Sequence, residues 1–180
     1  MNYTNYAYEL IKDIPLDVFE GLTSIVCIGM VTFIAWKGWK TGIRLTSVLL
    51  LVEYVFLIFS STVIFRSVSA TRQYDFHPFW SYKAIQEGRV DLLQENIMNV
   101  VVFIPVGVLL GFMFQGSRFK MTWWKALLIG CSISITIEAL QFCFMKGFSE
   151  LDDVMHNTLG CILGYMSAWC WGRKWSIMGR

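Results

Sequence analysis

Hydrophobic residues along the chain are gathered into five long stretches, with polar residues mainly between them. The stretches cover residues 18–36, 45–65, 97–114, 126–144 and 154–171. A helix needs roughly 17 to 25 residues to cross the hydrocarbon core of a bilayer, so each stretch is about long enough. Strand-length segments of alternating polarity, typical of membrane barrels, are not visible. The pattern predicts an all-α, polytopic membrane protein with five transmembrane helices.

The composition agrees with this class. Hydrophobic residues make up 56% of the 180 residues and charged residues 16%, whereas soluble domains carry about a quarter of charged residues. The net charge of +2 is small, and the bases are spread over the loops instead of forming a patch, which does not support nucleic-acid binding. We expect a multi-pass protein of the cell membrane.

The loop charges predict the orientation of the helices. Basic residues dominate the second and fourth polar segments and the C-terminal tail, namely Lys37, Lys40, Arg44, Arg118, Lys120, Lys125, Arg173, Lys174 and Arg180. The bases of the other face are mixed with an excess of acids. Because cytoplasmic loops are enriched in Lys and Arg, the N-terminus is expected outside and the C-terminus inside.

This topology divides the chain into segments. We expect an extracellular segment at 1–17, whose acids argue against a cleaved signal peptide, and a first helix with its cytoplasmic loop at 18–44. A four-helix membrane domain follows at 45–171, with a cytoplasmic tail at 172–180. Within the domain, the outer loop 66–96 is long enough to suggest a functional role, and a short interfacial helix is expected after Pro78, where Ala84, Ile85, Leu92 and Leu93 suit it.

Polar residues in or beside three of the apolar stretches are the main candidates for function. They are Asn99, Glu138, Gln141, Asp153 and Asn157. The predicted topology brings all five to the outer face, and the pairs at spacings of three or four residues share helical stripes. An ionised carboxylate in the membrane costs at least a few kcal/mol. Glu138 is therefore expected to face the bundle and to pair with Asn99 or Gln141, or to carry a proton.

A structural role is the alternative for each of these residues. Asn and Gln side chains often join transmembrane helices, and Asp152 and Asp153 stand where they could cap the fifth helix. Small-xxx-small spacings at 107–111 and 160–164 predict that the third and fifth helices pack tightly against the fourth. The same spacing suits a contact with another protein or a second copy, so a homo-oligomer is left open.

Cations and metal ligands complete the candidate chemistry. Arg66 and Arg72 lie on the predicted outer side and could neutralise a phosphate head group, or could simply be solvated loop residues. Glu138, Asp153 and His156 could be drawn as a metal site, but a two-residue DxxH match arises often by chance. The five cysteines form no CxxC pair. We predict no metal and no cofactor.

Four short motifs in order resemble the VanZ-like family of bacterial membrane proteins. They are His77-Pro78-Phe79, Asn99-Val-Val-Val-Phe103-Ile-Pro105-Val-Gly107, Glu138-Ala-Leu-Gln141 and Asp152-Asp153-Val-Met-His-Asn157-Thr-Leu-Gly160-Cys-Ile-Leu-Gly164. His77 and His156 stand where the family usually has apolar residues. The resemblance covers roughly 45–171 and implies resistance to a lipoglycopeptide such as teicoplanin, without supplying a reaction.

The function expected from these observations is binding rather than catalysis. An outer-leaflet polar pocket would bind an amphiphile, either a lipid-linked cell-wall intermediate or the lipoglycopeptide, with Asp152, Arg66 and Arg72 beside the five polar residues. One alternative is an intramembrane hydrolase or transferase acting on a lipid-linked sugar or phosphate, with Glu138 and Asp153 exchanging a proton. The other is a noncatalytic partner in an envelope complex.

Overall fold

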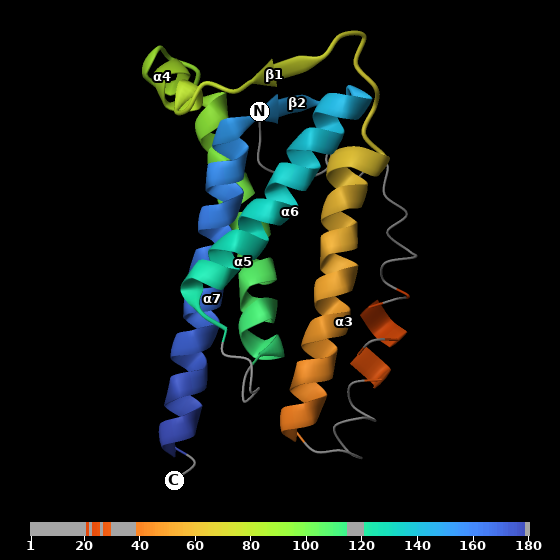
Figure 1. Ribbon diagram of the computed structural model, residues 1–180, viewed down its shortest axis with the longest axis vertical. Coiled ribbons are helices and arrows are strands. Elements are labelled where there is room, and N and C mark those ends of the chain that lie inside the picture. Colours follow the sequence, from red (N-terminus) through yellow and green to blue (C-terminus); the bar gives the residue numbers. More distant parts are fainter. Residues whose placement is uncertain (1–20, 22, 26, 30–38, 115–120, 179–180) are drawn as a thin grey trace.

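The computed structural model describes residues 21, 23–25, 27–29, 39–114 and 121–178 (Figure 1). The elements in chain order are α3 (Trp39–Phe59), the π-helix η1 (Ser60–Ile64), β1 (Gln73–Asp75), α4 (Trp80–Gln86), α5 (Asp91–Met113), α6 (Trp123–Phe144), β2 (Phe148–Glu150) and α7 (Leu151–Met178). The described chain is thus mostly helical. Two short strands correct the expectation of an all-helical protein.

Three of the described helices are long and apolar enough to cross a membrane, at Thr41–Ile64, Asp91–Met113 and Trp123–Phe144. They match the second, third and fourth predicted spans. The first predicted span, 18–36, falls mostly outside the described residues, although positions 21, 23–25 and 27–29 are helical; segment 1–17 lies wholly outside them. The protein is a membrane protein, while the five spans and their orientation stay predictions.

The fifth predicted span is a helix with different bounds. α7 starts at Leu151, three residues earlier than expected, and runs to Met178, so most of the predicted tail 172–180 is helical. It is less apolar than the other long helices because it carries polar residues on a buried face, among them Asp152, His156 and Asn157. An inward polar face lowers the hydropathy of the helix without exposing those groups to lipid.

α5 and α7 pack against each other through glycines rather than both against α6. A Cβ on Gly107 would overlap the carbonyl oxygen of Cys161, and one on Gly160 would overlap the carbonyl oxygen of Val100. Such backbone contact requires residues without a side chain. The predicted small-xxx-small faces therefore meet each other, and α6 joins α7 separately at Gly130, whose Cβ would lie 2.7 Å from the Cβ of Cys161.

The outer loop 66–96 is more ordered than expected. It contains β1, which pairs in parallel with β2 from Gln73↔Phe148 to Asp75↔Glu150, and α4, a short helix after Pro78 as expected, which includes Ala84 and Ile85 but ends before Leu92. α5 begins at Asp91, six residues before the predicted start of its span, so the last part of the loop is helical. In Figure 1, α4 and the strand pair lie across one end of the bundle.

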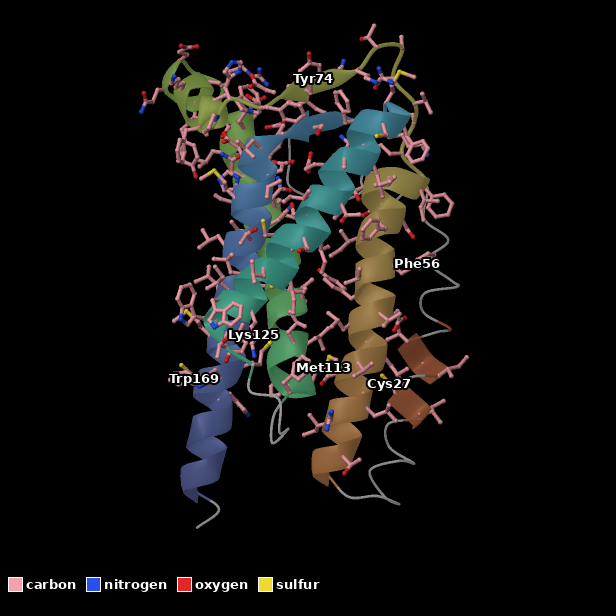
Figure 2. All side chains as sticks on the ribbon, in the orientation of Figure 1. Cys27, Phe56, Tyr74, Met113, Lys125 and Trp169 are labelled. Carbon is pink, nitrogen blue, oxygen red and sulfur yellow. The ribbon has the colours of Figure 1, made fainter. Side chains whose placement is uncertain are left out.

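The two ends of the bundle are therefore different. Figure 2 places Tyr74 of β1 at the end with the strand pair, and Met113 of α5 and Lys125 of α6 toward the other. The apolar core between them includes Phe103, Val106 and Leu110 of α5, all buried. Tyr54 of α3 donates a hydrogen bond of 2.9 Å to the carbonyl of Val102, which ties α3 to α5.

Candidate functional site

A cavity of about 760 Å³ opens where the helices meet the strand pair. Residues of α3, η1, α4, α5, α6 and α7 line it, together with β1, β2 and the loops that follow η1 and α4. All five polar residues singled out in the sequence are among the lining residues, namely Asn99, Glu138, Gln141, Asp153 and Asn157. The structure therefore brings together side chains that are up to 58 positions apart in sequence.

Each long helix contributes its polar residues by regular spacing. α6 supplies Glu138 and Gln141, three positions apart, and α7 supplies Asp153 and Asn157, four positions apart, so each pair faces the same way. Asn99 of α5 lies opposite α7 and donates a hydrogen bond of 2.6 Å to the Asp153 carboxylate. The polar faces of α5, α6 and α7 are therefore directed toward the same cavity.

Glu138 has a different partner from the ones predicted. It is 6% exposed, and its Oε2 accepts a hydrogen bond of 2.8 Å from the backbone N–H of Glu150. Neither Asn99 nor Gln141 donates to it, since Asn99 is bonded to Asp153 and Gln141 donates to the carbonyl of Thr62 at 3.1 Å. The chain that follows α6 folds back and supplies the donor.

The π-helix η1 forms part of the cavity wall through Ser61 and Thr62. Its wider turn shifts backbone carbonyls out of the regular α-helical ladder, and such turns are frequent at functional sites. The Thr62 carbonyl is the one that accepts from Gln141. The hydroxyl groups of Ser61 and Thr62 both donate to the Ile58 carbonyl, at 2.9 and 2.7 Å, so both hydroxyl hydrogens are used within the helix.

Asn157 and Asp152 have structural roles, one in joining two helices and the other in capping a helix. Asn157 donates a hydrogen bond of 2.8 Å to the hydroxyl of Ser134, which joins α7 to α6. Asp152 is fully buried and does not line the cavity. Its carboxylate accepts from the Phe79 N–H at 2.6 Å and from the Ser81 N–H at 3.0 Å, so it caps α4 instead of its own helix.

The cations divide between the cavity and the surface. Arg66 lines the cavity, and its guanidinium lies against Gly147, where a Cβ would come within 2.6 Å of the Arg66 Cζ. Arg89 also lines the cavity and pairs with Asp91 at 2.9 Å. Arg72, predicted as a binding residue, is absent from the lining; its guanidinium lies 5.4 Å from the ring centre of Phe142.

Two acids of the cavity wall were not predicted from the sequence. Glu95 precedes Asn99 by one helical turn, so the two side chains share a face of α5. The sequence would have indicated this only if the helix had been predicted to begin at Asp91. Glu150 lies in β2, its side chain accepts a hydrogen bond of 2.9 Å from Trp80 Nε1, and no periodic signal points to it. Burial, with the nearby Asp153 carboxylate adding to the effect, raises the pKa of Glu150 to about 8.

The remaining candidates lie away from this cavity. His156 is buried, and its Nε2 is 2.8 Å from the hydroxyl of Tyr82. Within the described residues no group of three or more His, Cys, Asp or Glu side chains is arranged to hold a metal ion. Glu53 accepts a hydrogen bond of 2.6 Å from Thr23 and lines a separate, mostly apolar space of about 240 Å³.

Comparison with known proteins agrees with the motifs in the sequence. The family model described as VanZ/LLP1 matches residues 45–172. Protein VanZ of Enterococcus faecium is 38% identical over 71 residues, which is 39% of this chain and 42% of that protein. The aligned part therefore spans less than half of this relative. No solved structure matches the chain. Because the family model covers most of the sequence, including every helix that lines the cavity, the chain belongs to the VanZ/LLP1 family.

Proposed function

We propose that this protein is a cell-envelope membrane protein of the teicoplanin-resistance type, whose cavity binds the polar head of an amphiphile. The ligand is a lipid-linked cell-wall intermediate or the acylated antibiotic itself, and its binding lowers the effect of the drug at the membrane. The observation that supports this most is the cavity of about 760 Å³ lined by polar residues of three helices. Small-molecule sites commonly measure about 300–1,000 Å³.

The cavity wall has the two kinds of side chain that an amphiphile needs. Carboxylates and amides line it together with apolar side chains such as Ile58, Val102 and Phe103. Apolar surface binds a hydrocarbon or ring portion through the hydrophobic effect, while placed polar groups fix the orientation of the head. A purely structural cluster would satisfy its polar groups internally and would leave no space of this volume.

The alternative role as a noncatalytic partner was suggested by the small-xxx-small faces, which are used within the chain. Gly107 and Gly160 lie in backbone contact within the chain, so these faces are not available to another protein. The hydrolase alternative keeps Glu138 and Asp153 in one cavity, but these two acids already have separate hydrogen-bond donors. Binding is the function that the geometry supports best.

Drug survival of cells making cavity variants tests the proposal. Glu138→Gln and Asp153→Asn keep the shape of each side chain and remove its charge, and Glu87→Gln removes an exposed acid outside the cavity. A hydrogen bond to a charged group is worth about 1.5–3 kcal/mol, which corresponds to roughly tenfold or more in affinity. We expect the first two variants to lose protection against teicoplanin and the third to keep it, at equal amounts of membrane protein. Full protection in both cavity variants would remove the cavity from the mechanism.

A further inference from the structure

One buried amide group in the cavity has an oxygen that no protein donor reaches. Gln141 is 4% exposed, lines the cavity and donates through Nε2 to the Thr62 carbonyl. Its Oε1 is buried without a hydrogen-bond partner among the described residues. A buried acceptor without a donor costs free energy, about 1–3 kcal/mol, so this oxygen marks a place where a ligand can donate a hydrogen bond.

The carboxylates around this amide also offer acceptor oxygens. Glu138 uses Oε2 for the Glu150 N–H, and Asp153 uses Oδ1 for Asn99. These two hydrogen bonds do not use the second carboxylate oxygens, Glu138 Oε1 and Asp153 Oδ2. The cavity therefore combines three acceptor groups, those of Glu138 and Gln141 on α6 and that of Asp153 on α7.

Acidic side chains outnumber basic ones in the lining of the cavity. Four carboxylates line the cavity, those of Glu95, Glu138, Glu150 and Asp153, against the two guanidinium groups of Arg66 and Arg89. The Arg89 guanidinium is already held by Asp91. Burial raises the pKa of Glu150, and the Asp153, Glu95 and Glu138 carboxyl groups add to the rise, which agrees with a site that disfavours a further negative charge.

A ligand group that fits these surroundings carries hydrogen-bond donors and positive charge. A primary ammonium has three N–H donors and no acceptor, and it would offset the charge of buried carboxylates that are costly when unpaired. A phosphate would bring acceptors to acceptors and negative charge to negative charge. The ammonium is an alternative to the phosphate head group that the arginines suggested in the sequence.

We propose that the cavity binds the primary ammonium group of an amphiphile, held by Glu138, Asp153 and Gln141, in preference to a phosphate. The proposal rests on the amphiphile binding proposed above and names the chemistry of the head group. Arg66 lies against Gly147 beside this group of acceptors. Its cation partly offsets the carboxylates of the empty cavity and competes electrostatically with a bound ammonium.

Calorimetry on the full chain in zwitterionic nanodiscs tests the proposal with three probes of equal chain length: dodecylamine, dodecyl phosphate and dodecanol. Empty nanodiscs give the heat of partition into lipid, which is subtracted. The variants are Glu138→Gln, Asp153→Asn and Gln141→Leu, with Glu87→Gln as the exposed acid that serves as control. Thermal unfolding of each variant shows that it is folded, and the three positions give independent readings should one variant fail to fold.

We expect saturable binding of dodecylamine, about tenfold weaker after each cavity substitution, unchanged in Glu87→Gln and tighter in Arg66→Gln. Dodecylamine binding that none of the cavity substitutions weakens would overturn the ammonium site. Preferential binding of dodecyl phosphate, lost in Arg66→Gln, would also overturn it while leaving the proposed amphiphile binding intact. No saturable binding of any probe would overturn both proposals.

Discussion

Glu150 shows how a single residue depends on its tertiary surroundings. It lies in a strand of three residues, yet its backbone N–H donates to Glu138 and its carboxylate accepts from Trp80. Burial and the nearby Asp153 raise the pKa of its carboxyl to about 8. The neutral form of Glu150 is thus favoured in the folded protein at neutral pH.

The raised pKa makes folding stability depend on pH. Between the ordinary carboxyl pKa of 4.5 and about 8, the unfolded chain releases the Glu150 proton and the folded chain keeps it, so this contribution is complete at low pH and declines as pH rises. We expect Glu150→Gln to reduce the fall of the thermal midpoint in detergent between pH 5 and pH 9.

The control for this measurement is Glu87→Gln, which removes an exposed acid outside the cavity. The Glu87 variant should follow the wild-type profile. Identical profiles for the Glu150 variant and the wild type would show that Glu150 does not retain its proton on folding.

The sequence identified individual residues where a polar side chain interrupts an apolar helix. Glu138, Asp153 and Asn99 are conspicuous for this reason, and all three line the cavity. Their hydrogen-bond partners could not be predicted, because a helical stripe gives the direction of a side chain and not the group it meets. Asp152 and Arg72 were placed in the pocket by sequence proximity and charge, but one caps α4 and the other lies over Phe142.

At the scale of elements, the packing of α5 on α7 determines the shape of the bundle. Gly107 lies against the backbone of Cys161 and Tyr165, where a Cβ would come within 2.6 Å of the Tyr165 nitrogen. Sequence spacing predicted small-residue faces on both helices. It did not show that the faces meet each other, because the same spacing serves any close helix contact.

This contact makes Gly107→Ala a destabilising change. The added methyl group forces α5 and α7 apart, and overpacking of this kind costs typically about 1–3 kcal/mol. The measurement is the free energy of unfolding in mixed micelles. Gly21→Ala is the matched control, since a Cβ at Gly21 meets nothing within 4 Å. Equal stability of the two variants would contradict the packing described for α5 and α7.

For the whole molecule, the arrangement gives one end of the bundle a structured cover. The β1–β2 pair and α4 lie across the end where the cavity opens (Figure 1). The charge of the loops predicts that this end faces outward. Orientation is a property of the protein in its membrane, so it is tested in cells.

Labelling with a membrane-impermeant maleimide in intact cells tests the orientation. The single cysteines are Glu87→Cys, beside α4, and Arg44→Cys, near the start of α3, both at exposed positions in a background without the native cysteines. We expect labelling at position 87 before lysis and at position 44 only after lysis. The reverse pattern would place the cavity on the cytoplasmic side and would contradict the proposed access from the outer leaflet.

The sequence by itself determined the membrane class, three of the spans, the family and five polar residues of the cavity, Asn99, Glu138, Gln141, Asp153 and Asn157. These properties follow from local composition, from helical periodicity and from motif spacing, which any segment carries with it. The tertiary structure alone decided that β2 returns a donor to Glu138, that the glycine faces of α5 and α7 meet, and that Gln141 keeps a free acceptor. Such contacts join segments far apart in the chain, and their geometry is set only when the helices pack.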